Sequence, residues 1–220
     1  MTKPVAFSYS RLDSFETCPK KFYAISVQKS VKDEGNQFTK YGEEVHLAFA
    51  DYFKKAKSLP MHMSQYQKFL SKIRAAPGQF IVEQQLAIDA NYEGCEWYSK
   101  DAYCRVISDL TIINDTHAVL WDWKTGKMKD GFDQLRLAGA VVFLLAPDVQ
   151  TMTMAYLWTQ SKKITKDTMV REDMPKVFEA LQPRLQRYQD AHANLDFPAR
   201  PGFACKYCPV KTCPYNEAKK

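Results

Sequence analysis

The segment CKYCPVKTC, residues 205–213, places three cysteines within nine positions near the end of the sequence. Clustered thiolates bind soft metals, and protein sites for zinc or for iron–sulfur clusters commonly use four of them. A fourth ligand must therefore come from far along the chain, where Cys18, Cys95 and Cys104 are available. Whichever of them supplies the sulfur, a distant segment has to fold back against the tail.

The three candidates differ in their surroundings. Cys18 is followed by proline, as are Cys208 and Cys213, and it lies in the basic aromatic segment CPKKFY. Cys95 and Cys104 flank an expected loop, where an ordinary thiol is the simpler interpretation. The tail contains a single CxxC pair, whereas structural zinc sites usually use two, so the spacing mildly disfavours zinc. The residues alone leave open both the fourth ligand and the metal.

The composition is typical of a globular protein large enough for one sizeable domain. The 220 residues are 45% hydrophobic and 25% charged. The net charge of +6 permits a polyanionic partner such as nucleic acid without requiring one. The N-terminus lacks the apolar core of a signal peptide, and the longest apolar run, 137–147, is too short for a membrane span. We therefore expect a cytoplasmic protein with no membrane partner, in which cysteines bind metal rather than form disulfides.

Hydrophobic periodicity predicts alternating helices and strands. A possible capping box at Ser10–Asp13 opens the first helix. Apolar residues at spacings of three and four predict the further helices, and β-branched and aromatic runs predict the strands. In chain order these elements are helices at 37–55 and 64–75, strands at 80–89, 103–113 and 118–124, a buried helix at 133–146, a strand at 151–159 and a helix at 171–194. This order predicts an α/β domain with a mixed sheet.

Two of the expected strands carry acidic residues that the hairpin between them would bring together. If Asp115 and Thr116 form a two-residue turn, Asp109 lies directly opposite Asp122 on one face of the sheet. A turn at Asn114 and Asp115 makes the two carboxylates diagonal neighbours, and a three-residue loop separates them. Paired carboxylates repel unless a cation lies between them, and such oxygen ligands suit Mg²⁺ or Mn²⁺.

Other polar residues could join these carboxylates. Lys124 shares the face of Asp122 and would orient a water or stabilise transition-state charge in metal-assisted phosphodiester hydrolysis. His46, in the segment GEEVH that begins at Gly42, could be a further ligand, although a lone helical histidine is more often structural. Glu83 could hold a second ion or be a surface charge. Gln134 could reach a phosphate or water, or be a plain polar residue at a helix start.

Taken in order, these segments resemble a known family. GEEVH, an aspartate on one strand, DWK on the next and a helix led by glutamine are similar to the PD-(D/E)xK nucleases of RecB type. The segments SYSRLDSFETCPKKFYA and CKYCPVKTC resemble its iron–sulfur subgroup, which includes AddB-type subunits and CRISPR-associated exonucleases. The resemblance spans nearly the whole chain. It implies a restriction-endonuclease-like core over 37–194 and a cluster-binding part formed by 1–30 and 195–220, within one nuclease domain.

The resemblance also implies roles for individual residues. The metal ligands are His46, Asp109, Asp122 and the backbone carbonyl of Trp123. The catalytic residues are the two aspartates together with Lys124 and Gln134. The cluster is [4Fe–4S], held by Cys18, Cys205, Cys208 and Cys213. Contacts to DNA would come from the basic and aromatic residues beside the cysteines, namely Lys20, Lys21, Tyr23, Lys206 and Tyr207.

Two departures from the family pattern bear on substrate binding. Ile107 lies where a glycine often precedes the aspartate, and Ala138 lies where a tyrosine often follows the glutamine. The Cys208–Cys213 loop is also one residue shorter than is common. The expected metal ligands are intact, so these differences concern DNA positioning.

The resemblance implies a DNA exonuclease of bacterial or viral origin. It would act on single strands or free ends, with 5′ to 3′ digestion, in recombination, repair, replication or spacer processing. It could form a homo-oligomer or join a helicase. The alternative is a catalytically inactive DNA-binding or assembly subunit with a metal staple of four cysteines, and a third interpretation is a zinc-ribbon protein with unrelated chemistry.

Overall fold

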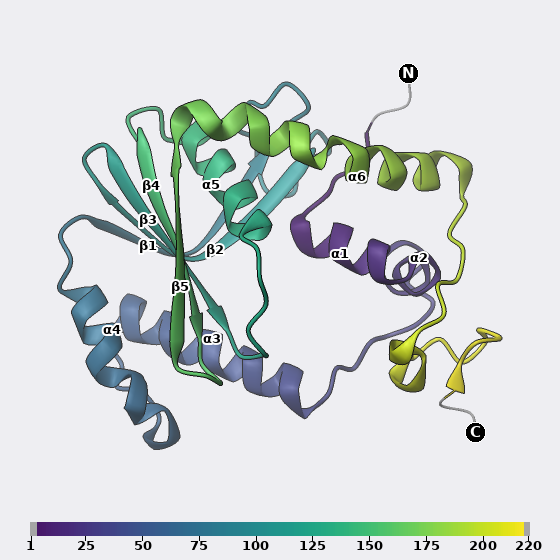
Figure 1. Ribbon diagram of the computed structural model, residues 1–220, viewed down its shortest axis with the longest axis horizontal. Coiled ribbons are helices and arrows are strands. Elements are labelled where there is room, and N and C mark those ends of the chain that lie inside the picture. Colours follow the sequence, from purple (N-terminus) through teal and green to yellow (C-terminus); the bar gives the residue numbers. More distant parts are fainter. Residues whose placement is uncertain (1–3, 218–220) are drawn as a thin grey trace. The chain divides into compact units, whose positions relative to one another are not determined.

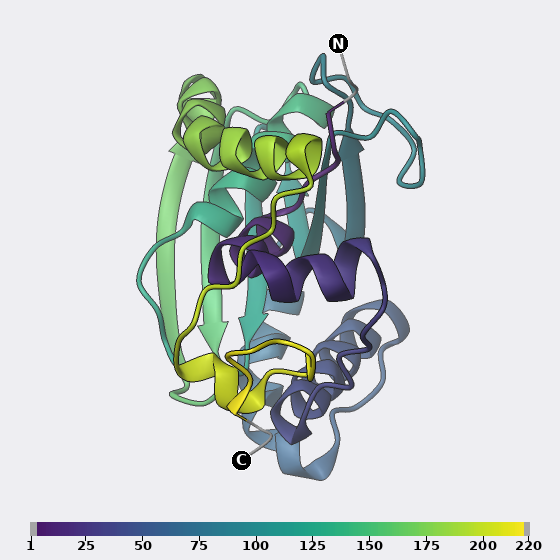
Figure 2. The same cartoon turned by 90° about the vertical axis from the view of Figure 1, so that its right-hand side faces the viewer.

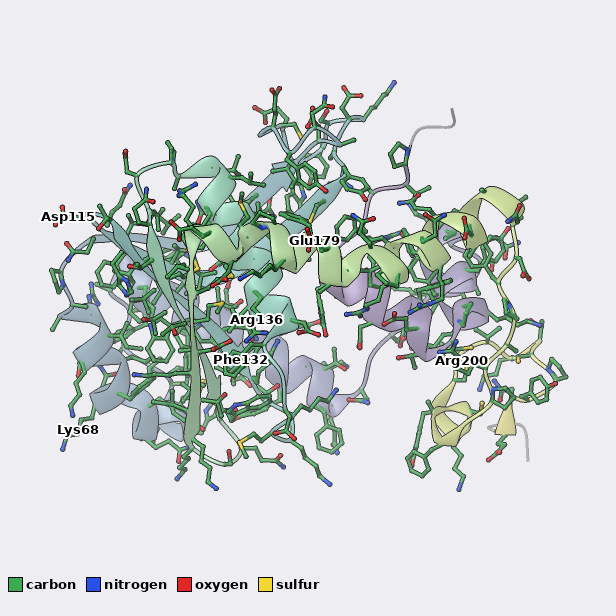
Figure 3. All side chains as sticks on the ribbon, turned by 45° about the horizontal axis from the view of Figure 1, so that its top comes forward. Lys68, Asp115, Phe132, Arg136, Glu179 and Arg200 are labelled. Atoms are coloured by element: carbon green, nitrogen blue, oxygen red, sulfur yellow. The ribbon has the colours of Figure 1, made fainter. Side chains whose placement is uncertain are left out.

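The computed structural model describes residues 4–217, which form two compact units. One unit, Gly35–Phe178, contains a β-sheet. The other, the terminal unit, combines the described residues before Gly35 with those from Glu179 onward. Helix α6 (Met174–Asn194) passes from one unit to the other at Glu179, which Figure 3 labels. Most of this helix, expected to belong to the nuclease core, groups with the N-terminal helices.

The sheet has five strands in the order β1-β2-β3-β4-β5 (Figure 1). Their bounds are β1 (Gln79–Ile88), β2 (Cys104–Asn114), β3 (His117–Lys124), β4 (Thr151–Trp158) and β5 (Lys163–Val170). Neighbouring strands are antiparallel except β3 and β4, which are parallel and connected through helix α5 (Asp133–Leu145). The prediction of a mixed sheet flanked by helices is confirmed.

Helices cover both faces of the sheet. On one face lie α3 (Gln37–Lys55), the 3₁₀ turn η2 (Met61–Tyr66) and α4 (Gln67–Arg74). They bury alternate strand residues such as Leu110, Trp121 and Trp123. Helix α5 packs on the opposite face, where a Cβ at Gly139 would lie 2.8 Å from Met152 Sδ. No helix in 4–217 is long and apolar enough to cross a membrane.

The predicted hairpin has the register of a two-residue turn. Asn114 pairs with His117, which leaves Asp115 and Thr116 as the turn. Asp115, labelled in Figure 3, has a φ of 50°, a left-handed conformation that aspartate tolerates better than most residues. The pairing continues to Leu110 opposite Trp121. The first of the registers considered above is therefore the correct one.

The terminal unit is built around aromatic side chains and contains both described chain ends (Figure 2). Its helices before Gly35 are α1 (Tyr9–Thr17), α2 (Pro19–Phe22) and a π-helical turn (Tyr23–Val27), and a 3₁₀ turn, η4 (Phe203–Tyr207), lies in the tail. Phe22 contacts the rings of Tyr188 and His192 edge-on. Glu16 accepts hydrogen bonds from the Arg184 guanidinium, the shortest at 2.7 Å, and this fork ties α1 to α6.

Three local features were not predicted from the sequence. The cap of α1 is Ser8, whose hydroxyl accepts from the N–H of Arg11, so the proposed capping box at Ser10 is wrong. The first helix breaks at Cys18, which is extended because the following Pro19 disfavours a helical conformation there. Strand β5 was not predicted, because it is an exposed edge strand with Met169 as its one fully buried residue.

Candidate functional site

Asp109 lies where β2 and β3 separate. The pairing of these strands stops at Leu110 and Trp121, one step before Asp109 would face Asp122. Beyond that point the backbone N–H of Trp123 donates to Asp109 Oδ2 at 2.7 Å. The carboxylate therefore takes the place of a backbone acceptor between the strands. Since the N–H and C=O of a strand residue point to the same side, the carbonyl of Trp123 also faces this gap.

His46 reaches the site from α3. Its Nδ1 lies 3.2 Å from Asp109 Oδ1, so the two oxygens of Asp109 have different partners. One turn earlier on the same helix, a Cβ at Gly42 would lie 3.1 Å from Thr125 Oγ1. The small residue at position 42 thus lets α3 lie close to the segment that follows β3.

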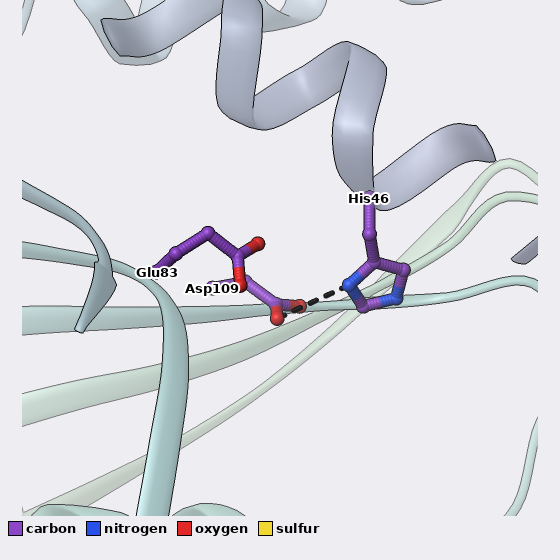
Figure 4. Close-up of side chains that lie close together, drawn as sticks. All are labelled: His46, Glu83 and Asp109. Atoms are coloured by element: carbon purple, nitrogen blue, oxygen red, sulfur yellow. Dashed lines mark hydrogen bonds and ion pairs between the residues drawn. The ribbon is translucent and has the colours of Figure 1, made fainter. Parts of the chain in front are cut away.

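Glu83 completes a group of possible metal ligands. Val82 pairs with Leu110 and Gln84 with Ser108, which places Glu83 opposite Asp109 in β1. Its φ of 52° is left-handed, a strained conformation for glutamate that costs about 1–3 kcal/mol. Ligand atoms of His46, Glu83 and Asp109 all lie within 4.8 Å of one another (Figure 4). Backbone strain of this kind often marks functional sites, and it leaves no signal in the sequence.

The electrostatics of this group favour a bound cation. Burial lowers the pKa of His46, but the hydrogen bond to Asp109 and the surrounding carboxylates outweigh burial and raise that pKa to about 9. Burial and the charge of Asp109 also raise the pKa values of Glu83 and Asp122. Negative charge is therefore crowded here, and a divalent ion would relieve the repulsion.

Asp122, Lys124 and Gln134 form a closed set of contacts next to Asp109. Lys124 Nζ lies 2.8 Å from Asp122 Oδ2 and donates to Gln134 Oε1 at 2.8 Å. Gln134 Nε2 in turn donates to Asp122 Oδ1 at 3.0 Å. Asp122 Oδ2 is buried, and apart from its ion pair with Lys124 it accepts no hydrogen bond from residues 4–217. This oxygen retains the capacity to bind a cation.

Aromatic rings support this arrangement from β4. Tyr156 pairs with Asp122 in the parallel register, and its ring centroid lies 5.2 Å from Lys124 Nζ. Phe132, labelled in Figure 3, stacks on Tyr156 at 5.3 Å and directly precedes α5, whose second residue is Gln134. The start of α5 is thus held where Gln134 reaches both charged partners.

The four cysteines Cys18, Cys205, Cys208 and Cys213 line one small pocket of the terminal unit, together with Lys20, Lys21 and Arg200. Backbone N–H groups point at two of the sulfurs: that of Arg200 lies 3.5 Å from Cys18 Sγ, and that of Gly202 lies 3.4 Å from Cys205 Sγ. Such N–H groups stabilise thiolates.

The other two cysteines do not line this pocket. Cys104 is fully buried in β2, and burial raises its pKa to about 12, as expected for an ordinary core thiol. Cys95 is half-buried in the loop before β2, and burial also raises its pKa.

The residues expected to contact DNA have different surroundings. Lys206 and Tyr207 lie on the turn η4, with the Tyr207 side chain 75% exposed. Lys21 forms an ion pair with Asp33 at 3.1 Å. Tyr23 is half-buried and stacks on Phe197 at 4.6 Å, so one face of its ring is covered.

Comparisons with known proteins identify the fold family. A family model described as the PD-(D/E)XK nuclease superfamily matches residues 6–214. Among solved structures, a candidate exonuclease from Eubacterium rectale has a TM-score of 0.54 and 13% identity, over 95% of this chain and 90% of that one. The crystal structure of SSO0001 has a TM-score of 0.43 and 14% identity, over 98% and 88%. No curated protein matches the sequence. At 13% identity, the likeness to the Eubacterium rectale structure concerns the fold alone.

Proposed function

Because this chain belongs to the PD-(D/E)XK nuclease superfamily, we propose that it is a divalent-metal-dependent deoxyribonuclease of the RecB-type iron–sulfur subgroup. The observation that carries the proposal is the convergence of His46, Glu83 and Asp109 beside the set formed by Asp122, Lys124 and Gln134. Hard oxygen ligands with one imidazole fit Mg²⁺ or Mn²⁺.

The proposed metal ligands are His46, Asp109, Asp122 and the carbonyl of Trp123, and Glu83 joins them because its carboxylate lies among them. The bound ion would supply Lewis-acid stabilisation of phosphoryl oxygens and activation of a water. The buried oxygen Asp122 Oδ2, whose one partner within residues 4–217 is the Lys124 ammonium, and the crowded carboxylates support this fit.

In this proposal Lys124 acts on the substrate and Gln134 positions its charged neighbours. The Lys124 ammonium, held by Gln134 Oε1 and Asp122 Oδ2, presents positive charge where a phosphodiester would lie. Gln134 fixes the positions of both charged partners through its amide, so that Lys124 does not have to be ordered when the substrate binds. Preorganised charge of this kind lowers the barrier because no reorganisation is needed during the reaction.

We further propose that the enzyme is an exonuclease acting on single strands or free ends, with 5′ to 3′ polarity. This part follows from the sequence resemblance and from the presence of rings and cations beside the cysteines. A role in recombination, repair, replication or spacer processing in the cytoplasm has the same basis, as does assembly into a homo-oligomer or with a helicase.

The cysteine pocket is proposed to hold a [4Fe–4S] cluster. All four cysteines line one pocket, and four thiolates suit either a zinc ion or an iron–sulfur cluster. The choice of the cluster follows from the sequence resemblance to the iron–sulfur subgroup and from the single CxxC pair in the tail, since structural zinc sites usually use two. The cluster would act as a structural staple, because it joins the break after α1 to the tail.

A cleavage assay tests the nuclease proposal. Protein purified without oxygen is incubated with end-labelled linear DNA, single- or double-stranded and with open or blocked ends, in Mg²⁺ or Mn²⁺. We expect cleavage by the wild type and by the surface control Lys68→Ala, and none by Asp122→Ala or Lys124→Ala. Absence of cleavage by the metal-loaded wild type, with DNA binding retained, would favour the inactive DNA-binding subunit. Blocked ends that are cut as fast as open ones would exclude an exonuclease.

A further inference from the structure

Exposed aromatic rings gather on the described part of the tail. The side chains of Phe203, Tyr207 and Tyr215 are 76%, 75% and 51% exposed. Phe203 and Tyr207 lie at the two ends of the turn η4, with their ring centroids 6.0 Å apart and their planes inclined by 59°. Two large rings so close together form one apolar surface, which is costly to leave in water without a partner.

The charge around these rings is positive. Lys206, on the same turn, has its Nζ 5.5 Å from the centroid of the Phe203 ring. Residues 199–217 contain the cations Arg200, Lys206 and Lys211 against a single acid, Glu217. An apolar protein partner would be matched poorly by this charge, whereas a polyanion with flat rings matches both properties.

We propose that Phe203 and Tyr207 form a platform on which the bases of single-stranded nucleic acid stack, with Lys206 neutralising the backbone. The inference rests on the proposed function, which makes DNA the ligand, and it names single strands as the form recognised. Bases in a duplex already stack on one another, so their faces are not available to these rings. Tyr23, whose ring is covered on one face by Phe197, is not part of the platform.

The test is equilibrium binding of a short fluorescent oligothymidine, without added divalent cation so that the strand stays intact. The Phe203→Ala/Tyr207→Ala variant should bind about 10- to 100-fold more weakly than the wild type, as loss of one or more stacked bases implies. Phe203→Trp/Tyr207→Trp keeps both rings and should retain affinity. Tyr98→Ala removes a tyrosine of the sheet unit that is even more exposed, at 88%, and should leave the affinity unchanged.

Two further probes separate stacking from charge. An abasic strand of the same length and a duplex of the same sequence should bind wild type and the double alanine variant equally. An equal loss of affinity for the abasic strand, or unchanged binding of oligothymidine, would overturn the proposal. The proposal would also be overturned if the wild type formed dimers, the double alanine variant did not, and both bound DNA with the same affinity. The rings would then form a protein interface.

Failure of the nuclease proposal has a separate readout. It would appear as lack of cleavage in Mn²⁺, while the binding differences described here do not depend on catalysis. Metal content per chain, measured for every variant, shows whether the cysteine pocket is intact. If the double alanine variant loses metal, its weak binding could reflect a damaged pocket, and the double tryptophan variant then provides the test. Weak binding of oligothymidine by a tryptophan variant with full metal content would overturn the proposal.

Discussion

The backbone N–H of Trp123 donates to Asp109 Oδ2 at 2.7 Å, across the gap between β2 and β3, while Asp109 Oδ1 lies 3.2 Å from His46 Nδ1. One oxygen is thus used to hold the strands where they separate, and the other faces the ligand group. The same carboxylate links the fold to the proposed chemistry.

Substitutions of Asp109 should separate these two roles. Asp109→Asn keeps an oxygen that can accept from Trp123, so we expect a folded protein that binds Mn²⁺ poorly and does not cleave DNA. Asp109→Ala leaves the buried N–H unpaired and should in addition lower the free energy of unfolding by about 1–3 kcal/mol. Urea denaturation of both variants measures the difference. Equal stabilities would show that the hydrogen bond does not contribute in solution.

Gln134 should affect turnover more than binding. Gln134→Ala leaves Lys124 and Asp122 without the amide that joins them, and we expect kcat to fall about 10- to 100-fold, as for other residues that orient catalytic groups. KM for DNA should change little, because the charges remain. Steady-state cleavage rates test this, with Gln186→Ala on α6 as a control of the same chemical change. A large rise in KM at unchanged kcat would show that Gln134 binds the substrate.

Metal binding should release a proton from His46. Its pKa of about 9 means that the metal-free protein carries this proton at neutral pH, whereas a metal ligand must be neutral. Affinity for Mn²⁺ should therefore rise with pH and level off above about 9, by up to roughly tenfold per unit.

Calorimetry at pH 7.5 in two buffers of different ionisation enthalpy checks the stoichiometry. Wild type and the exposed-histidine control His62→Gln should both release about one proton more than His46→Gln. Identical apparent enthalpies in the two buffers for the wild type would contradict the prediction.

Residue patterns predicted most of the sheet unit but not its most unusual feature. The hairpin register could be derived because a two-residue turn fixes which residues face each other, and it holds from Asn114–His117 to Leu110–Trp121. The direct pairing of Asp109 with Asp122 is not formed, because the strands separate there and Asp109 accepts from the N–H of Trp123 instead. The left-handed backbone of Glu83 depends on tertiary contacts, so its place among the possible ligands stayed open. Strand β5 was missed because its sequence, KITKDTMV, does not alternate between polar and apolar residues, although successive side chains of a strand point to opposite faces of the sheet.

The strained backbone at Glu83 should make a glycine variant more stable than an alanine variant, the reverse of the usual order in a strand. In a strand, alanine is normally the more stabilising of the two by about 0.5–1 kcal/mol. At a φ of 52° glycine is unstrained and alanine is not, so Glu83→Gly should be more stable than Glu83→Ala, by about 1 kcal/mol. Both lack the carboxylate and should bind Mn²⁺ more weakly than the wild type. Thermal unfolding of the metal-free variants tests the order, and alanine equal to or above glycine would argue against the left-handed backbone.

Loss of the Cys18 thiolate should release the bound metal and with it the link between the N-terminal helices and the C-terminal tail. A metal bound by Cys18 and the three C-terminal cysteines closes almost the entire chain, and thiolate–metal bonds contribute directly to folding. Cys18→Ala should therefore lose the metal, together with any absorption near 400 nm, and its free energy of unfolding should fall by at least about 3 kcal/mol, as for loss of a cross-link closing a long loop. Cys95→Ala, outside the pocket, should keep the metal.

The outcomes are distinguished by measuring iron and zinc content, absorption and melting temperature on protein prepared without oxygen. A wild type that contains zinc and does not absorb near 400 nm would have a four-cysteine zinc site in place of the cluster. Full metal content and an unchanged melting temperature in Cys18→Ala would show that Cys18 is not a ligand.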